Sequence, residues 1–218
     1  MKKKIVKFLN CKIDVSKKVF IPRIETEYWI GKAIKQIKKK NLKNLDILDI
    51  FSGTGCIGIA VLKNYPKLCK NLDFIDISKN AISEIKINID LNKIPKNRCR
   101  AYTSSFFEIP KVYNRKYDII FANPPYIAKK RIFQVQKKVL KTEPKTALFS
   151  GKDGMNHIKR FLRQVKNYLK PNGIFFLEFD PLQKKSIENI LKKQGFKFKF
   201  YKDQFKKWRW LRAGIKKF

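Results

Sequence analysis

The chain has 218 residues, of which 44% are hydrophobic and 32% charged, and its formal net charge is +35. This length and apolar content support one α/β domain and argue against global disorder. Four scattered cysteines without a CxxC pair and a single histidine argue against a zinc cluster or a Ser-His-Asp triad, so no metal is expected, and no stretch approaches the 18 apolar residues of a membrane span.

The first half of the chain alternates predicted helices with predicted strands. Apolar residues at helical spacing predict an amphipathic helix over residues 25–40, and the buried run 45–51 is typical of a strand. A glycine turn over 52–58 leads from that strand into a second helix. A further strand is expected over 72–77, and Ser78 is well placed to cap the helix that follows.

The second half continues this alternation. A weak strand is expected over 100–103 and a strong one over 117–126, and apolar spacing predicts a long helix over 155–169. The apolar run 173–180 is typical of another strand, and the helix after it is expected to end at Gly195.

The chain is predicted to close with a β-hairpin. Phenylalanines alternate with lysines over 196–200, and the aromatic residues of 208–211 lie in the last predicted strand. Alternating strands and helices predict an α/β fold with a mostly parallel sheet, helices on both faces and an antiparallel hairpin at its edge. We expect one catalytic domain over 1–218, in which residues 1–40 cover the site and residues 41–218 form the core.

A glycine motif follows the first strong strand. Gly53, Gly55 and Gly58 form GxGxxG before the acidic strand end at Asp76. Alone, this motif fits NAD, FAD or S-adenosylmethionine, because each needs a close approach to bare backbone. Asp49 favours S-adenosylmethionine, since its carboxylate would oppose a pyrophosphate but could hold an ammonium group directly or through water. Asp76 is the expected partner of the ribose hydroxyls. The alternative is that both aspartates are ordinary strand-end residues.

A second motif, Asn123-Pro124-Pro125-Tyr126, lies where the strong strand over 117–126 should end beside the cofactor. Two prolines remove two donors and hold the backbone extended, so the carbonyls beside them lack internal partners. With an amide oxygen from Asn123 and a flat ring from Tyr126, the site suits a planar nitrogen of an amide or a base amine. Accepting both of its hydrogens would aim the nitrogen at a sulfonium methyl group. The alternative is a proline turn with Tyr126 in the core.

Four sequence blocks occur in order along the chain. They are FIPRIETE at 20–27, LDIFSGTGCIGIA at 48–60, FANPPYIA at 121–128 and TEPKTALFSGKDG at 142–154. With these blocks the chain resembles the HemK family, S-adenosylmethionine-dependent enzymes that methylate the glutamine side-chain amide in the GGQ motif of peptide-chain release factors. The resemblance continues through LEFD and YKDQF to the C-terminus. NPPY alone is shared with DNA adenine and RNA guanine methyltransferases, so the first and last blocks single out HemK.

This resemblance implies a Rossmann-like seven-stranded methyltransferase fold and roles for particular residues. The residues expected to hold the target amide are Asn123, Pro124, Pro125 and Tyr126, of which Asn123, Pro124 and Tyr126 are the expected catalytic set. The residues expected to bind S-adenosylmethionine are Asp49, Gly53, Gly55, Asp76, Ser105 and Asn123.

The first and last blocks are expected to shape the substrate pocket. The resemblance puts Arg23 and Glu25 in a segment over the active site, and it puts Glu143 and Pro144 in a loop beside the substrate. The alternative for the charged residues is a local salt bridge among many lysines, because exposed ion pairs contribute little.

The chain departs from the family pattern at three places. Ser105 stands where the family usually has an acidic residue near the adenine, so cofactor affinity is expected to be lower. Ile24 stands where proline is common. Only about 19 residues precede the first block, so we expect the family's separate N-terminal helical domain to be absent.

The resemblance implies a release factor as the partner, and the basic surface leaves nonspecific contact with RNA or the ribosome open. The cations are mostly Lys rather than Arg, and Lys, Ile, Asn and Phe make up nearly half of the chain. Because all four have A/T-rich codons, we interpret much of the charge as mutational bias rather than selected polyanion binding. No membrane partner is expected, and the protein is expected to be cytoplasmic. Two alternative functions stay open: an RNA or DNA exocyclic-amine methyltransferase, and an inactive binding module.

Overall fold

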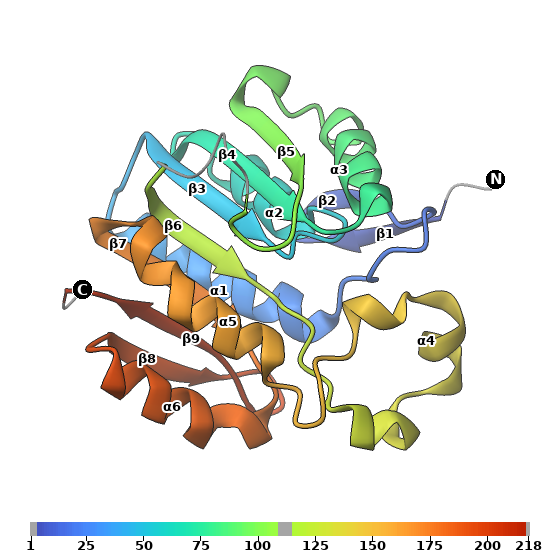
Figure 1. Cartoon of the computed structure of the whole chain (residues 1–218). Coiled ribbons are helices and arrows are strands. Elements are labelled where there is room, and N and C mark those ends of the chain that lie inside the picture. The colour runs from blue at the N-terminus through green and yellow to red at the C-terminus, as the bar shows by residue number, and fades with distance from the viewer. Residues whose placement is uncertain (1–3, 109–114, 217–218) are drawn as a thin grey trace.

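A seven-stranded sheet forms the centre of the computed structural model, which describes residues 4–108 and 115–216 (Figure 1). Its order is β5-β4-β3-β6-β7-β9-β8. β9 runs antiparallel to β7 and to β8, and the other neighbouring strands pair in parallel. The predicted mostly parallel sheet with an antiparallel C-terminal hairpin is therefore confirmed. The strands are β3 (Leu45–Ile50), β4 (Cys69–Asp76), β5 (Cys99–Thr103), β6 (Tyr117–Ala122), β7 (Leu169–Glu178), β8 (Lys197–Lys202) and β9 (Trp208–Gly214).

Helices cover both faces of this sheet, because its central strands are apolar on both sides. In β6, Ile119 and Phe121 pack with α1, α2 and α3, whereas Ile120 and Ala122 pack with α5 and α6. The α-helices are α1 (Ile24–Lys39), α2 (Cys56–Asn64), α3 (Lys79–Leu91), α4 (Lys137–Thr142), α5 (Asn156–Gln164) and α6 (Lys184–Lys193). Short 3-10 turns lie at Lys96–Arg98, Lys129–Gln134, Lys145–Ala147, Val165–Tyr168 and Pro181–Gln183.

An N-terminal hairpin of β1 (Ile5–Phe8) and β2 (Cys11–Asp14) packs against α3, and the sequence analysis did not predict it. Lysines interrupt the apolar residues of this segment, and each strand has only four residues. The alternation of apolar and polar residues was therefore too short to indicate a hairpin. Asn88 of α3 holds the hairpin by donating to the carbonyl oxygens of Asp14 and Thr54 at 3.0 Å each. The hairpin is thereby tied to the glycine turn.

Two predicted boundaries were wrong. The helix predicted over 155–169 gives way to β7 at Leu169, because this buried residue pairs with Tyr117 across the sheet. The strand predicted over 117–126 ends at Ala122, since the prolines that follow cannot donate to a neighbouring strand. Ser78 caps α3 as predicted, with its hydroxyl accepting from the Ala81 amide at 3.3 Å.

Among residues 4–108 and 115–216, no helix combines the length and the apolarity needed to cross a lipid bilayer.

Candidate active site

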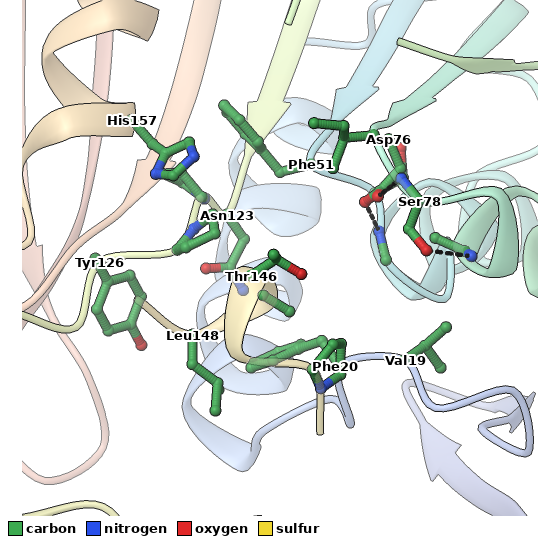
Figure 2. A pocket seen from close by; sticks show the side chains of 18 of the residues that line it. Val19, Phe20, Phe51, Asp76, Ser78, Asn123, Tyr126, Thr146, Leu148 and His157 are labelled. Carbon is green, nitrogen blue, oxygen red and sulfur yellow. Dashed lines mark hydrogen bonds between the residues drawn. The ribbon is translucent and has the colours of Figure 1, made fainter. Parts of the chain in front are cut away.

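A cavity of about 530 Å³ lies at the carboxyl edge of the sheet, where β3, β4 and β6 end. Figure 2 shows Asn123 between Asp76 on one side of the cavity and Tyr126 on the other, with Phe20 and Leu148 along its edge. Within the described residues, no three His, Cys, Asp or Glu side chains form a group that could hold a metal ion. The cavity wall presents carboxylate, amide, hydroxyl and aromatic groups.

The glycine turn carries the chain from β3 into α2 with little side-chain bulk over the cavity. Gly53 has φ +53°, in the left-handed region that favours glycine, and its amide donates to Asp76 at 2.9 Å. Gly58 is required for packing instead, because a Cβ there would overlap the side chains of Phe74 and Leu72 on β4. Gly53 thus leaves the backbone accessible at the cavity, and Gly58 lets α2 pack closely against β4.

Asp76 presents its carboxylate to the cavity from the end of β4. One oxygen accepts from the Gly53 amide and the other from the Ser78 amide, each at 2.9 Å. Burial raises the pKa of this carboxyl, and the backbone N–H donors oppose that rise. The neighbouring Ile77 is 67% exposed and offers an apolar face on the cavity wall. A carboxylate beside an apolar platform fits the ribose hydroxyls and flat base of S-adenosylmethionine.

Asp49 lies beneath the turn and not on the cavity wall. It is fully buried, its Oδ2 accepts from the Gly58 amide at 3.0 Å, and its Oδ1 has no partner within the described part of the chain. Burial raises the pKa of this carboxyl well above its usual range. Its bond to Gly58 anchors the glycine turn, and its predicted role toward a cofactor ammonium, directly or through water, stays a prediction.

Ser105 lines the cavity after β5, at the position where the sequence predicts the adenine. Its hydroxyl oxygen accepts from Arg160 at 3.3 Å, and the guanidinium of Arg160 lies 4.0 Å from the ring centre of Phe106. The serine therefore stands in a cationic and aromatic setting.

An aromatic wall of Phe51, Phe106 and His157 was not predicted. Phe51 meets Phe106 edge-on at 5.1 Å between ring centres, and His157 stacks on Phe106 at 5.8 Å. Both phenylalanines have positive φ, +61° and +58°, which costs on the order of 1–3 kcal/mol each. Burial and the nearby Arg160 lower the pKa of His157, which favours a neutral ring. Sequence patterns carry no signal for bulky residues in this backbone conformation.

Asn123 follows directly after β6, and its amide nitrogen donates to Thr26 Oγ1 of α1 at 3.4 Å. Since Nδ2 is turned toward Thr26, Oδ1 is the amide atom left to accept hydrogen bonds from a ligand. Tyr126 lines the cavity with its ring and donates its hydroxyl to Glu178 Oε1 at 3.0 Å. The motif thus offers an acceptor and a flat ring to the same cavity.

Glu178, at the end of β7, is a buried carboxylate that the sequence analysis missed. Its Oε2 accepts from Thr26 Oγ1 at 2.8 Å and from the indole nitrogen of Trp29 at 2.6 Å. Burial raises the pKa of this carboxyl, while its hydrogen bonds and the positive charge of Arg209 oppose the rise. Its position in LEFD was visible in the sequence, but its partners come from segments distant along the chain.

The first and last sequence blocks meet at the cavity. Arg23 pairs with Glu143 at 2.6 Å, and the Ile21 amide donates to the second carboxylate oxygen of Glu143 at 3.3 Å. Arg23 and Pro144 line the cavity, whereas the Glu143 side chain is buried behind it. The Arg23–Glu143 salt bridge therefore links the segment over the cavity to the loop beside it.

The structure brings most of the predicted site residues to one cavity. Those on its wall are Arg23, Gly53, Asp76, Ser105, Asn123, Pro124, Pro125 and Tyr126, and those off it are Glu25, Asp49, Gly55 and Glu143.

Comparison with known proteins identifies the family of the chain. The family model for the methyltransferase small domain matches residues 12–154. A release factor glutamine methyltransferase of Borreliella burgdorferi is 34% identical over 194 residues, covering 87% of this chain and 63% of that protein. A protein of the same name from Streptococcus pneumoniae is 33% identical over 205 residues, covering 91% of this chain and 68% of that one. The chain thus spans about two thirds of the length of these relatives.

Solved structures of methyltransferases share the fold. The T. thermophilus 16S rRNA N2 G1207 methyltransferase, in complex with AdoMet and guanosine, matches with a TM-score of 0.68 at 14% identity, over 99% of this chain and 50% of that one. The ribosomal protein L11 methylase of Lactobacillus delbrueckii subsp. bulgaricus matches with a TM-score of 0.64 at 18% identity. The match covers 91% of this chain and 82% of that one. From its family match and its curated relatives, the chain belongs to the methyltransferase small domain family and, within it, to the release factor glutamine methyltransferases.

Proposed function

We propose that this protein transfers a methyl group from S-adenosylmethionine to the side-chain amide nitrogen of the GGQ-motif glutamine in a peptide-chain release factor. The observation that carries this proposal is the direction of the Asn123 amide. Its nitrogen is bound to Thr26, so its oxygen is free to accept from an amide placed in the same cavity as Asp76. The names of the curated relatives support the choice of substrate.

A primary carboxamide has two N–H donors, and the NPPY segment offers acceptors for both. Oδ1 of Asn123 accepts one hydrogen, and the carbonyl oxygen of Pro124 is the expected acceptor of the other. Each bond increases electron density on the target nitrogen and fixes its direction, so positioning and electrostatics supply the rate. The ring of Tyr126 packs beside the planar amide and excludes water from that face.

The cofactor end of the cavity needs a different set of residues. Gly53 leaves room for it on the cavity wall, and Gly55 shapes the turn from behind that wall with its positive φ of +74°. Asp76 accepts from the ribose hydroxyls, and Ser105 hydrogen-bonds near the adenine. When bound, S-adenosylmethionine supplies an electrophilic methyl group. Asp49 contributes by holding the glycine turn through the Gly58 amide.

The two outer blocks are proposed to form the rim of the substrate pocket. Arg23 lines the cavity and its pairing with Glu143 holds the rim in place, with Glu25 in the first turn of α1 next to it. We further propose that the single domain over 1–218, with residues 1–40 as its cover, acts in the cytoplasm during translation termination.

A second candidate function is methylation of an exocyclic amine of RNA or DNA. The segment 129–145 next to the cavity holds seven Lys and Arg but one acidic residue, Glu143, which is buried in the pair with Arg23. This density of cations exceeds the chain average and suits phosphate contacts, including nonspecific contact with RNA or the ribosome. A base amine is also planar and would fit the same acceptors.

Transfer of radiolabel from S-adenosylmethionine tests the proposal against this candidate. We expect label in a release factor, no label in the same factor with Gln→Ala in its GGQ motif, and much slower labelling by the enzyme variant Asn123→Ala. Label in ribosomal RNA or DNA, with the release factor unlabelled, would select the second candidate.

A further inference from the structure

Three residues from distant parts of the chain form one line of hydrogen bonds that runs from the NPPY segment into the protein interior. Thr26 lies in the first turn of α1, Asn123 follows β6, and Glu178 ends β7. Asn123 Nδ2 donates to Thr26 Oγ1 at 3.4 Å, and Thr26 Oγ1 donates to Glu178 Oε2 at 2.8 Å. Thr26 and Glu178 are each only 1% exposed, so solvent does not compete for the bond between them, whereas the Asn123 end of the line is half-buried at the cavity wall.

The direction of each bond in this line follows from the donors that surround Glu178. The indole of Trp29 can only donate, and it reaches the same oxygen as Thr26 at 2.6 Å. The Tyr126 hydroxyl donates to the other oxygen. With the single hydroxyl hydrogen of Thr26 directed at Glu178, the oxygen of Thr26 can only accept from Asn123.

This constraint selects one of the two orientations of the Asn123 amide. Rotation by half a turn would place Oδ1 against the lone pairs of Thr26 Oγ1 and would direct the NH₂ group at the ligand. The NH₂ group of Asn123 would then face the NH₂ group of the substrate, and the target nitrogen would lose a hydrogen-bond acceptor. The orientation of one side-chain amide thus decides whether the site can hold its acceptor nitrogen.

We propose that Thr26 and Glu178 are positioning residues that hold the Asn123 amide with its oxygen toward the acceptor. Within the NPPY segment Thr26 bonds to Asn123, and it also donates to Glu178. Glu178 in turn accepts from the Tyr126 hydroxyl, so its loss is expected to affect both Asn123 and Tyr126. The proposal rests on the proposed function for the presence of a planar acceptor nitrogen, but a glutamine amide and a base amine would both need the same orientation.

The kinetic test uses Thr26→Val, which is similar in volume and lacks the hydroxyl, and Thr26→Ser, which keeps it. We expect Thr26→Val to lower kcat about tenfold or more with less than a twofold change in the dissociation constant of S-adenosylmethionine, measured by titration calorimetry. We expect Thr26→Ser to keep kcat within about threefold of the wild type. Equal losses in both variants, or a loss of cofactor affinity that parallels the loss of kcat, would overturn the proposal.

A double-mutant comparison shows whether Thr26 acts through Asn123. In an Asn123→Ala background, single-turnover methylation should respond to Thr26→Val by less than about twofold, because the amide to be positioned is gone. A full additional tenfold loss would overturn the proposal. Whichever acceptor the wild type labels, release factor or nucleic acid, is used here, so an error in substrate class does not decide the outcome.

A readout without turnover separates this proposal from the proposed function. In ¹⁵N spectra of the whole protein, the Asn123 side-chain amide is assigned as the NH₂ pair that Asn123→Ala removes. We expect its protons to exchange with water faster by about tenfold or more in Thr26→Val than in the wild type and in Thr26→Ser. Unchanged exchange in Thr26→Val would overturn the proposal even if the enzyme methylates a release factor.

Discussion

The backbone of Gly154 packs against the carbonyl oxygen of Tyr126 so closely that a Cβ atom on Gly154 would overlap it. Gln183 secures this contact by donating from Nε2 to the carbonyl oxygens of Tyr126 and Gly154, at 2.9 and 3.1 Å. These hydrogen bonds hold the last sequence block against the NPPY segment. Its final glycine, Gly154, leaves the space that the Tyr126 carbonyl group occupies.

Substituting this glycine should therefore impair catalysis as well as stability. Gly154→Ala must move the Tyr126 carbonyl, so we expect kcat to fall at least tenfold. Gly195→Ala is the matched control, because Gly195 has φ +75° against +78° for Gly154 but nothing lies within 4 Å of its Cβ position. The control should cost about 1–2 kcal/mol of unfolding free energy from backbone strain alone and leave kcat unchanged. Equal effects of the two variants on kcat would contradict this role.

Removal of the Asp76 carboxylate should weaken cofactor binding. Its loss removes charge-assisted hydrogen bonds worth about 1.5–3 kcal/mol, so Asp76→Ala should bind S-adenosylmethionine about 10- to 100-fold more weakly in titration calorimetry. Asp90→Ala, an exposed carboxylate on α3, should bind as the wild type does. Unchanged affinity in Asp76→Ala would remove this residue from the cofactor site.

The buried Glu84 predicts a specific pH dependence of stability. It accepts from the Ser16 and Lys17 amides at 3.2 and 3.1 Å, and burial together with the neighbouring Asp14 raises its pKa from 4.5 to about 7. Between these values the folded chain keeps a proton that the unfolded chain releases. Its contribution to stability is therefore complete below pH 4.5 and is lost as the pH rises toward 7, by about 1.4 kcal/mol for each unit of pKa difference.

Denaturant unfolding at several pH values between 4.5 and 7 measures this contribution. Glu84→Gln cannot titrate, so its unfolding free energy should fall less steeply with pH than that of the wild type. Asp90→Asn, on the exposed face of the same helix, should keep the wild-type slope. A Glu84→Gln protein with the wild-type slope would show that another group titrates in this range.

Local patterns were enough to predict the sheet and part of the cavity wall. Apolar runs identified the strands, and the glycine turn with the following acidic strand end identified Gly53 and Asp76 before any contact was known. Parallel strands bring their carboxyl ends to one edge, so Asn123 could be predicted to lie near Asp76 from the order of strands alone.

The residues that sequence patterns missed depend on contacts between distant segments. Thr26 and Glu178 are 152 positions apart, and neither has a sequence context that predicts a shared hydrogen bond. Phe51 and Phe106 have positive φ, which aromatic residues rarely adopt, so a pattern of residue types cannot predict their backbone. Asp49 was predicted to hold a cofactor ammonium directly or through water, and that role stays a prediction; its Oδ2 accepts from the buried Gly58 amide, a contact that the spacing alone did not indicate.

The identity of the methylated group tests the central claim most directly. A release factor incubated with the enzyme and S-adenosylmethionine is digested, and the peptide with the GGQ motif is fragmented in a mass spectrometer. We predict one added methyl group on the glutamine side chain, and a strongly reduced yield of that product in the same reaction time when Asn123→Ala replaces the wild type. An unmodified glutamine, with the methyl group recovered on another residue or on RNA in the same reaction, would contradict the account.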